Sequence, residues 1–353
     1  MEKELLYFYK KYPKSKIVDY VRTILQSEFF KERKIPDEEI SFDYLLRDVH
    51  RAKTLHDENQ DLYEFISDNL VKVNLYTYTK MGFNLRYLNT SFVNTTNNYE
   101  GSSNEFNTKL NTLLKLIKER KINLPTKESK KFIKKYIADG YPLIHHSKTF
   151  IKTYHPAYRL IHKQFITDEM RFMNIKNFVL KQKFKNNTVK IAIEGKSGSG
   201  KSTIAMLLLE SFDSTVIHVD DFFLDDKMKT KERLDEVGGN INYEALQNVL
   251  NNININKPLK FNKYNCTIKE YEEKIIAKVN KIIFIEGVYS MHPKLYDYYD
   301  ATIYLDVDET IQLKRLKERE TPFKFNKYIN EWIPLENIYF EKENIRYKAT
   351  LRV

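Results

Sequence analysis

A phosphate-binding loop is the strongest chemical signal in the sequence. Residues 195–202 read Gly-Lys-Ser-Gly-Ser-Gly-Lys-Ser, which fits the pattern G-x-x-x-x-G-K-[ST]. Glycines let the backbone curl so that its N–H groups point at phosphate oxygens. The Lys201 ammonium would reach the β- and γ-phosphates, and the Ser202 hydroxyl would bind Mg²⁺. The pattern predicts these nucleotide-binding residues: Gly195, Lys196, Ser197, Gly198, Ser199, Gly200, Lys201, Ser202 and Thr203.

The flanking sequence distinguishes this loop from a Gly- and Ser-rich turn that fits the pattern by chance. The apolar run 189–193 precedes the loop, and the helix-like run 203–210 follows it. The motif requires this strand–loop–helix order, because the helix N-terminus adds positive potential at the phosphates. We therefore expect a nucleoside triphosphate, ATP with Mg²⁺, although the sequence does not separate ATP from GTP.

Two acidic motifs follow apolar runs that are typical of strands. Asp220 and Asp221 come after the run 215–219, and Glu286 comes after the run 281–285. Ligand sites of parallel α/β sheets lie beyond the carboxyl ends of the strands. One aspartate could deprotonate an acceptor hydroxyl while the other supports Mg²⁺, and Glu286 would touch the metal or the acceptor. The alternatives are a turn or helix cap for the aspartates and a structural role for Glu286.

An arginine pair completes the predicted catalytic set. Arg315 and Arg319 are four residues apart, so they share one face of the helix expected over residues 309–319. Arginines on a mobile lid could neutralise the charge that develops during phosphoryl transfer. The alternative is a structural role, because basic residues often stabilise the last turn of a helix. The predicted catalytic residues are thus Lys201, Asp220, Glu286, Arg315 and Arg319, with Ser202, Asp220 and Glu286 as metal ligands.

The elements around these motifs predict an α/β P-loop NTPase domain with a parallel sheet over residues 186–353. Strands are expected at 190–194, 215–219, 281–285, 301–307 and 349–353. Helices are expected at 200–212, 243–251 and 309–319.

Residues 1–185 are expected to form a separate, mostly α-helical domain. Apolar residues recur at spacings of three and four in the segments 14–31, 37–55, 57–73, 105–120 and 127–138. Residues 89–104 are rich in Asn, Thr and Ser and are predicted to be a mobile loop. The domain boundary is expected near residue 185, before the break at Asn186 and Asn187.

The positive charge of the chain belongs to its first half. Residues 1–190 hold 35 Lys and Arg against 22 Asp and Glu, whereas residues 191–353 hold 24 against 26. A surface for RNA or DNA is one interpretation. A solvated, Lys-rich face is the other, and we favour it because the lysines are spread along the sequence.

Four histidines lie close together between residues 145 and 162. They are His145, His146, His155 and His162. His155 and His162 would share a helix face if Pro156 began a helix. The spacing fits no standard zinc pattern. Besides metal binding, the histidines could form a polar substrate pocket, contribute to an interface with the second half of the chain, or be ordinary packed and surface residues. The role of these histidines stays open.

Bulk composition restricts the class of protein. The chain has 353 residues, 42% hydrophobic and 30% charged, which is typical of globular domains. Its single cysteine, Cys266, excludes an intrachain disulfide. No run approaches about 18 apolar residues, so we expect no membrane helix, and the first residues do not resemble a signal peptide. A cytoplasmic protein is expected, and its oligomeric state is not indicated.

Residues 189–353 resemble the uridine kinase and phosphoribulokinase-like branch of P-loop kinases. Gly195–Ser202, Val219–Phe223 and Ile285–Ser290 carry the resemblance, with Arg315 and Arg319 in the position of the family's lid. The resemblance implies that Asp220 is the base for the acceptor hydroxyl. It also points to acceptor contacts by Asp221, Asn240, Tyr243 and Tyr264.

Two further stretches bear on this resemblance. The family's nucleoside kinases often carry a Tyr-Asp pair where this chain has Tyr264-Asn265. The block 332–340 looks like one in proteins labelled uridine kinase-like, and its aromatic residues could equally be packing.

These observations predict an ATP-dependent phosphotransferase that acts on a hydroxyl of a small molecule. A nucleoside-like compound is the preferred candidate for this acceptor. Two alternatives remain. One is a nucleotide-dependent switch whose basic half binds nucleic acid or protein. The other is a kinase that acts on a macromolecule.

Overall fold

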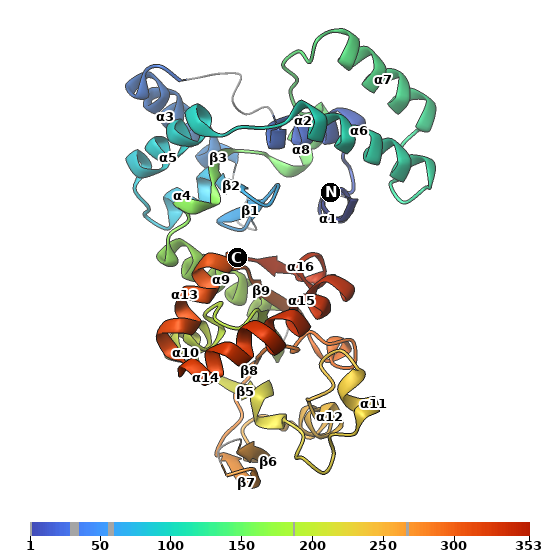
Figure 1. The fold of residues 1–353 in the computed structure, drawn as a ribbon. Coiled ribbons are helices and arrows are strands. Elements are labelled where there is room, and N and C mark those ends of the chain that lie inside the picture. Colours follow the sequence, from blue (N-terminus) through green and yellow to red (C-terminus); the bar gives the residue numbers. More distant parts are fainter. Residues whose placement is uncertain (1, 29–34, 56–59, 186–187, 266–267) are drawn as a thin grey trace. The chain divides into compact units, whose positions relative to one another are not determined.

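A computed structural model describes residues 2–28, 35–55, 60–185, 188–265 and 268–353, and its contacts divide the chain into two compact units (Figure 1). The first unit is Met1–Asn174 and the second is Ile175–Val353. The division falls within helix α9, Asp168–Lys185, and therefore lies before the boundary expected near residue 185. Asn186, Asn187 and Cys266 lie outside the described residues.

Helices dominate the first unit, as predicted. Their bounds are α1 Glu2–Lys11, α2 Ile17–Glu28, α3 Glu38–Leu55, α4 Leu75–Lys80, α5 Leu85–Asn98, α6 Ser103–Lys118, α7 Thr126–Ala138 and α8 Lys148–Tyr154, with a short 3₁₀ turn at Lys163–Phe165. The spacing of apolar residues explains why they pack. In α6, for example, Leu110, Leu113 and Ile117 share one face and are buried in a core with side chains from α1, α2 and α7.

A small sheet in the first unit corrects the helix predicted over residues 57–73. Strands β1, Tyr63–Phe65, β2, Leu70–Asn74, and β3, Tyr158–His162, pair antiparallel in the order β1-β2-β3. Every residue of β2 is buried, including Lys72. Pairing on both edges and complete burial favour an extended strand over the helix that the local spacing suggested.

Helix α5 corrects the loop predicted over residues 89–104. The polar residues that suggested a loop are compatible with a helix, because their hydroxyl groups donate hydrogen bonds to backbone carbonyls one turn earlier. Ser91 Oγ donates to Tyr87 O at 2.8 Å, and Thr95 Oγ1 donates to Ser91 O at 2.6 Å. The end of α5, at Asn98, and the start of α6, at Ser103, leave only a short connection.

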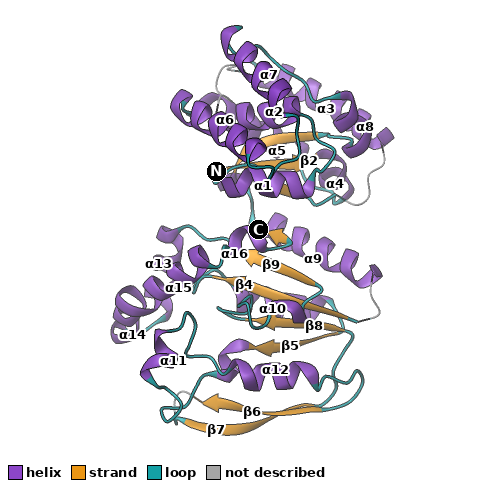
Figure 2. Ribbon diagram, turned by 90° about the vertical axis from the view of Figure 1, so that its right-hand side faces the viewer, coloured by secondary structure: helices purple, strands orange, loops and turns teal. Residues whose placement is uncertain are grey.

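The second unit is built on a five-stranded parallel sheet, and the predicted P-loop NTPase fold is confirmed (Figure 2). The strand order is β10-β9-β4-β8-β5. The strands are β4 Val189–Gly195, β5 Ser214–His218, β8 Ile282–Glu286, β9 Ala301–Leu305 and β10 Leu351–Arg352. All five coincide with predicted strands, because a strand buried on both faces is a continuous apolar run.

Helices and short turns connect these strands. The helices are α10 Lys201–Ser211, α11 Lys231–Asp235, α12 Tyr243–Asn251, α13 Glu309–Arg319, α14 Pro322–Lys327, α15 Ile333–Lys342 and α16 Ile345–Lys348. A 3₁₀ turn at Val219–Phe222, another at Tyr296–Tyr298 and a π-helical turn at Tyr328–Trp332 complete the connections. The three predicted helices match α10, α12 and α13.

The register of the sheet aligns the ends of three neighbouring strands. Glu286, the last residue of β8, pairs with Ile193 on β4 and with His218 on β5. The phosphate loop leaves β4 two residues later, at Gly195. The loop, the Glu286 carboxylate and the turn after β5 therefore meet at one edge of the sheet.

A hairpin that the sequence analysis did not predict packs against the turn after β5. Strands β6, Leu259–Asn265, and β7, Glu270–Ile276, pair antiparallel outside the main sheet. The Phe261 ring on β6 stacks on Phe222 with the ring centroids 5.2 Å apart. Since β7 carries many charged residues, its sequence lacks the apolar run by which the sheet strands were recognised.

Candidate active site

The phosphate loop has the backbone conformation that its glycines predict. Gly198 and Gly200 have φ of 78° and 95°, in the left-handed region that glycine adopts without strain. At Gly195 a Cβ atom would lie 2.7 Å from the Leu305 carbonyl oxygen, so a side chain there would collide with β9. Glycine is therefore required both to curve the loop and to keep it against the sheet.

Lys201 lies at the first position of α10, next to the concave side of the loop. Its Nζ donates to Gly195 O at 2.8 Å and to Lys196 O at 3.1 Å, and the residue is only 8% exposed. The first backbone bond of α10 runs from Ile204 N to Gly200 O. The earlier N–H groups of the helix therefore point out of its N-terminus, where an anion can accept them.

A carboxylate from the C-terminal region holds the middle of the loop. Glu336 on α15 is 4% exposed and accepts hydrogen bonds from Ser197 N, at 2.9 Å, and from Ser197 Oγ. On the same loop, Gln312 Nε2 donates to Ser197 O at 2.9 Å. Sequence analysis missed Glu336, which belongs to the block 332–340. No local spacing marks it, because its partner lies 139 residues away.

We expect Glu336→Gln to weaken nucleotide binding about tenfold, because the Ser197 amide and hydroxyl would lose a charged acceptor. Calorimetric titration of the protein with ADP would measure the change. Glu341→Gln on the same helix is the matched control, since Glu341 is exposed. Equal or tighter ADP binding by the Glu336 variant would show that this carboxylate does not support the loop.

The predicted metal ligands Ser202 and Glu286 lie in contact. Ser202 Oγ donates to Glu286 Oε1 at 3.1 Å, and Glu286 Oε2 lies 2.8 Å from His218 Nδ1. The hydrogen bond to Glu286 raises the pKa of His218. Burial alone would raise the pKa of Glu286, but the His218 hydrogen bond and Lys201 outweigh burial and lower it. Glu286 is therefore an anion held in place by His218, a partner that sequence analysis did not assign.

Asp220 and Asp221 differ in their electrostatic surroundings. Lys274 on β7 pairs with Asp221 at 2.5 Å, whereas Asp220 forms no ion pair with any residue that the structure describes. Asp220 is exposed at the end of β5, yet the surrounding protein removes enough water to raise its pKa, against the opposing effect of Lys201. Of the two carboxylates, Asp220 is thus the one without a neutralising partner.

The oxygen atoms at this edge suit Mg²⁺. Ser202, Glu286 and Asp220 offer a hydroxyl and two carboxylates, the hard donors that this ion prefers. Over the described ranges no group of three or more His, Cys, Asp or Glu is arranged to hold a metal. Mg²⁺ in phosphoryl-transfer sites is held by one or two carboxylates together with substrate phosphates, so the donor set fits that use.

The two arginines occupy different positions. Arg315 Nη1 donates to Gly198 O at 3.2 Å, so this guanidinium already touches the phosphate loop. Arg319 is more exposed and donates to Glu320 Oε1 at 2.7 Å and to Tyr328 OH at 3.3 Å. The structure brings Arg315, and not Arg319, against the loop.

The predicted acceptor contacts are spread around the turn after β5. Asn240 accepts from Leu224 N through its backbone carbonyl at 2.9 Å. Tyr264 on β6 is nearly buried against Tyr271, its partner across the hairpin. Tyr243 is fully buried and stacks on His292, with ring centroids 4.1 Å apart. Its ring belongs to the core, so it does not line an accessible surface.

A second buried carboxylate lies directly before the loop. Glu194 is fully buried and accepts from Gly195 N at 2.9 Å, Met291 N at 3.0 Å and Tyr339 OH at 3.0 Å. Burial raises its pKa to about 7, although these hydrogen bonds and Lys201 act in the opposite direction. Glu194 joins the start of the loop to α15 through Tyr339.

The raised pKa of Glu194 predicts a pH-dependent stability. The contribution of this group is complete below its ordinary pKa of 4.5 and is lost as the pH rises through about 7. Relative to Glu194→Gln, the wild-type protein should therefore lose about 3 kcal/mol of unfolding free energy between pH 5 and pH 8. Urea denaturation of both proteins across this range measures the difference. A difference that does not vary with pH would contradict the titration of Glu194.

The four histidines lie in the first unit, and no helix runs from His155 to His162, so these two do not share a helix face. Helix α8 ends at Tyr154, His155 has a left-handed φ of 43°, and His162 ends strand β3. His146 is buried and lies 3.1 Å from Asp19 Oδ1, whereas His145 is exposed.

Comparisons with known proteins agree with the site in the second unit. The profile of a family described as an AAA domain matches residues 191–331. A uridine kinase of Clostridium perfringens is 27% identical over 171 residues, which cover 43% of this chain and 80% of that protein. A uridine kinase of Bacillus mycoides is 26% identical over 176 residues, covering 44% and 81%.

Among solved structures, one described as a possible uridine kinase from Bacillus stearothermophilus aligns with 51% of this chain and 99% of that chain. Its TM-score is 0.40 and its sequence identity is 19%. In addition, no helix in the described parts of the chain has the length and apolar character needed to cross a membrane.

Proposed function

We infer that this chain transfers the γ-phosphoryl group of ATP to a hydroxyl of a small molecule. The inference starts from the second unit, which is a uridine kinase-like P-loop kinase. One observation carries the proposal. The phosphate loop, the anionic Glu286 and the unpaired Asp220 meet at one edge of the sheet. A nucleotide-binding switch needs the phosphate loop and Glu286. A kinase also needs a base beside the γ-phosphate, and Asp220 is the candidate for this base.

Each residue has a distinct part in this proposal. Lys201 and the amides of the loop bind the phosphates, and Arg315 adds positive charge beside Gly198. Ser202 and Glu286 would hold Mg²⁺, which supplies charge neutralisation between the β- and γ-phosphates. Asp220 orients the acceptor hydroxyl and accepts its proton as the new bond forms.

A nucleoside-like acceptor is the first candidate. The curated relatives named uridine kinases match this chain over about 80% of their own length, which supports the choice. The chain has Tyr264-Asn265 where nucleoside kinases of this family often have Tyr-Asp. Asn265 Nδ2 donates to Glu272 Oε1 at 3.1 Å, so a carboxylate lies beside the amide that replaces the acid.

A coupled assay of ADP release tests the proposal. Uridine, cytidine, nicotinamide riboside, pantothenate and simple sugars would each be supplied with ATP and Mg²⁺. The proposal requires one acceptor that raises ADP release in the wild-type protein and is recovered with one added phosphate by mass. Slow hydrolysis that no compound stimulates would count against a small-molecule kinase.

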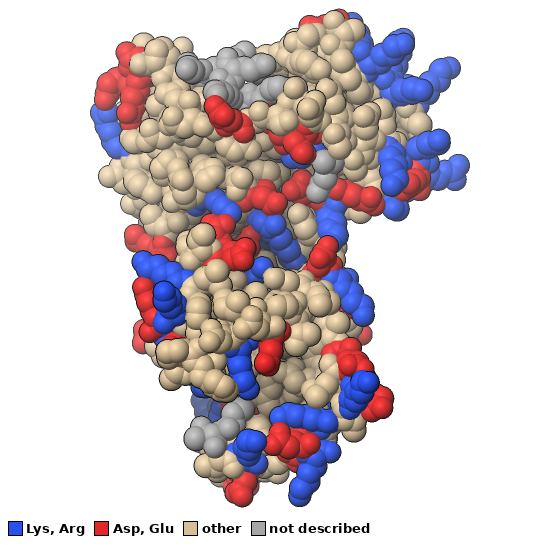
Figure 3. Space-filling view, in the orientation of Figure 1, with Lys and Arg blue, Asp and Glu red and all other residues tan. Residues whose placement is uncertain are grey.

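A basic surface supports the alternative of a nucleotide-dependent switch. Helix α7 exposes Lys127, Lys130, Lys131, Lys134 and Lys135, and Figure 3 shows Lys and Arg side chains gathered over it. In this alternative the first unit binds a polyanion such as RNA while ATP is hydrolysed. The expected sign is ATP hydrolysis that RNA stimulates and that added salt suppresses. Stimulation that is independent of RNA would remove this candidate.

A further inference from the structure

Two cavities in the first unit share Tyr158 and Pro156 in their linings. The smaller one has a volume of about 170 Å³ and the larger one about 560 Å³. Tyr158 and Pro156 line both, and all other lining residues also belong to the first unit. Neither cavity has a part in the phosphoryl-transfer site of the second unit.

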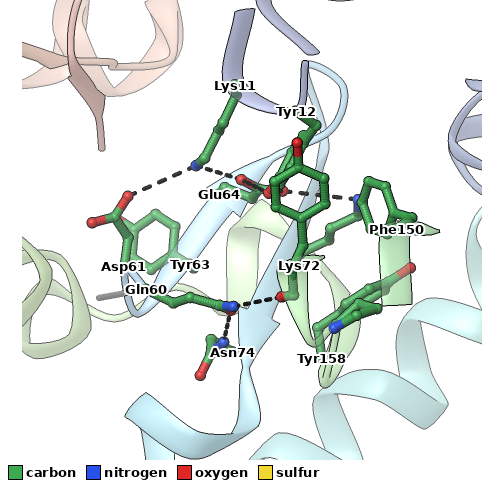
Figure 4. Close-up of a pocket in the computed structure, with 12 residues that line it drawn as sticks. Lys11, Tyr12, Gln60, Asp61, Tyr63, Glu64, Lys72, Asn74, Phe150 and Tyr158 are labelled. Carbon is green, nitrogen blue, oxygen red and sulfur yellow. Dashed lines mark hydrogen bonds and ion pairs between the residues drawn. The ribbon is translucent and has the colours of Figure 1, made fainter. Parts of the chain in front are cut away.

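The smaller cavity satisfies its own charges. Glu64 is paired with Lys11, lies 3.8 Å from Lys72 Nζ and accepts from Tyr12 OH, as Figure 4 shows. Lys11 also lies 3.8 Å from Asp61. Two lysines therefore face two carboxylates, and the network is neutral without a ligand. This balance is typical of a cluster that stabilises the fold.

The larger cavity has an excess of positive charge. Arg22, Arg51 and Arg159 line it, and Asp48 is the one carboxylate in its lining. Asp48 Oδ2 lies 2.7 Å from Arg159 Nη1 and so neutralises one arginine of the three. Over the described ranges no carboxylate pairs with Arg22 or Arg51. Two guanidinium groups around this cavity thus have no carboxylate partner among the residues that the structure describes.

Unused donors strengthen this charge argument. The Nε atoms of Arg22 and Arg159 are buried and have no hydrogen-bond partner among the described residues. Arg22 donates instead through Nη1 to the Ile144 carbonyl oxygen, which fixes the side chain beside the cavity. A buried donor without an acceptor is unfavourable, so an acceptor that enters the cavity would stabilise it.

The lining of the larger cavity also includes apolar side chains. Leu25, Leu143 and Leu160 line it together with the Phe92 ring, which lies 5.3 Å below the Arg159 guanidinium. Leu143 is 50% exposed, although an apolar side chain of this size is usually buried. The lining therefore combines cationic and apolar side chains, and the volume of the cavity is typical of sites for small organic ligands.

A chain of hydrogen bonds fixes the tyrosine between the cavities. Asp19 Oδ1 lies 3.1 Å from His146 Nδ1, and His146 Nε2 lies 3.2 Å from Tyr158 OH. Burial lowers the pKa of His146 to about 4, although its hydrogen bond to the Asp19 carboxylate acts against this shift. The imidazole is therefore neutral and adds no charge. Tyr158 OH donates to Gln26 Oε1 at 3.0 Å, and this bond and the His146 contact hold the phenol ring at the cavity wall.

We propose that the larger cavity binds a small organic anion, whose phosphate or carboxylate group lies between Arg22 and Arg51 and whose apolar body packs against Leu25, Leu143 and Phe92. Guanidinium groups bind both kinds of anion in a bidentate manner, so the cavity selects the charge and the apolar body together. The proposal does not depend on the kinase activity, because the cavity lies wholly within the first unit.

Phenyl phosphate and phenylacetate are suitable probes, because each joins an anionic group to an aromatic body. Titration of the full chain by calorimetry, with the phosphate loop saturated by ATP and Mg²⁺, separates this cavity from the kinase site. We expect saturable binding of at least one probe in the presence of ATP. Benzyl alcohol, which lacks the charge, and inorganic phosphate, which lacks the ring, should each bind at least about tenfold more weakly.

Substitutions locate the binding. Arg51→Gln and Arg22→Gln should each lower the affinity for the probe by about tenfold or more, since each removes a charged donor. Arg47→Gln is the matched control, because Arg47 lies one turn earlier on α3, is exposed and does not line the cavity. The thermal unfolding midpoint of each variant is compared with that of the wild-type protein. If Arg22→Gln does not fold, Arg51→Gln still tests the proposal, because Arg51 is exposed.

Four results would overturn the proposal. They are no saturable binding of either probe, displacement of the probe by ATP, equal affinity for the uncharged or ring-free control, and equal weakening by Arg47→Gln. The relative affinities of phenyl phosphate and phenylacetate would identify which anionic group the cavity prefers.

Discussion

Lys201→Ala is expected to lower acceptor-dependent ADP release by at least about 100-fold, the usual effect of removing one preorganised positive group from a transition-state site. The ammonium lies 2.8 and 3.1 Å from two loop carbonyls, so its position is fixed before nucleotide arrives. No other lysine belongs to the predicted loop except Lys196, whose backbone carbonyl accepts from Lys201. The loss therefore has no nearby substitute.

Lys190→Ala is the control for this prediction. Lys190 lies near the start of β4, the strand whose other end leads into the loop. Its Nζ donates to Leu250 O at 3.3 Å. This variant should retain nearly full activity. A Lys201→Ala protein that folds and keeps more than about one tenth of wild-type activity would be inconsistent with phosphate binding by this lysine.

Asp220→Asn is expected to lower kcat by about 100- to 10,000-fold, the range usual for a lost general base. The amide keeps the size of the carboxyl group but cannot accept the hydroxyl proton. Steady-state kinetics with the identified acceptor would measure the loss in kcat. Asp225→Asn serves as the control, because its carboxylate accepts from Lys227 N and Met228 N in a turn.

The pH profile gives an independent test of Asp220. Its carboxyl group must be ionised to accept a proton, so kcat/KM should fall as the pH drops through its pKa. Because desolvation raises this pKa, the acid limb should lie above the value of about 3.9 that is ordinary for aspartate. Full activity of the Asp220→Asn protein would assign the base to another group. So would a wild-type profile whose acid limb lies no higher than the ordinary pKa of aspartate.

The nucleotide-binding half was largely predictable from the sequence, for physical reasons. Strands such as β4 and β8 are buried on both faces, so they appear as continuous apolar runs that few other structures require. The chemistry-bearing residues follow those runs directly. Once the strands are parallel and adjacent, Glu286 must lie beside the loop that follows β4.

The contacts that brace the site were not predictable, because they join residues far apart along the chain. Glu336 is a single acid on a helix, and only the folded chain brings it to Ser197. His218 falls within the strand expected over residues 215–219, but its role depends on the register between β5 and β8. Lys274 lies on a hairpin whose charged sequence gave no strand signal.

The first unit shows a different limit of sequence analysis. Its helices were mostly predictable from their apolar spacing, as in α6 and α7. Strand β2 was not, because its extended conformation depends on pairing with β3, which is distant in the sequence. The same pairing builds the cavity wall at Tyr158. The local pattern therefore gave the helices of this unit but none of its cavities.

The most direct test of the central claim follows the fate of the γ-phosphate of ATP. The wild-type protein is incubated with ATP labelled at that group, Mg²⁺ and the best acceptor from the ADP-release assay, and the products are separated. Phosphoryl transfer to a hydroxyl predicts that the label appears in a phosphate ester of the acceptor, and that Lys201→Ala and Asp220→Asn do not form it. Label found only in free inorganic phosphate, whatever acceptor is present, would contradict the claim and leave an ATPase.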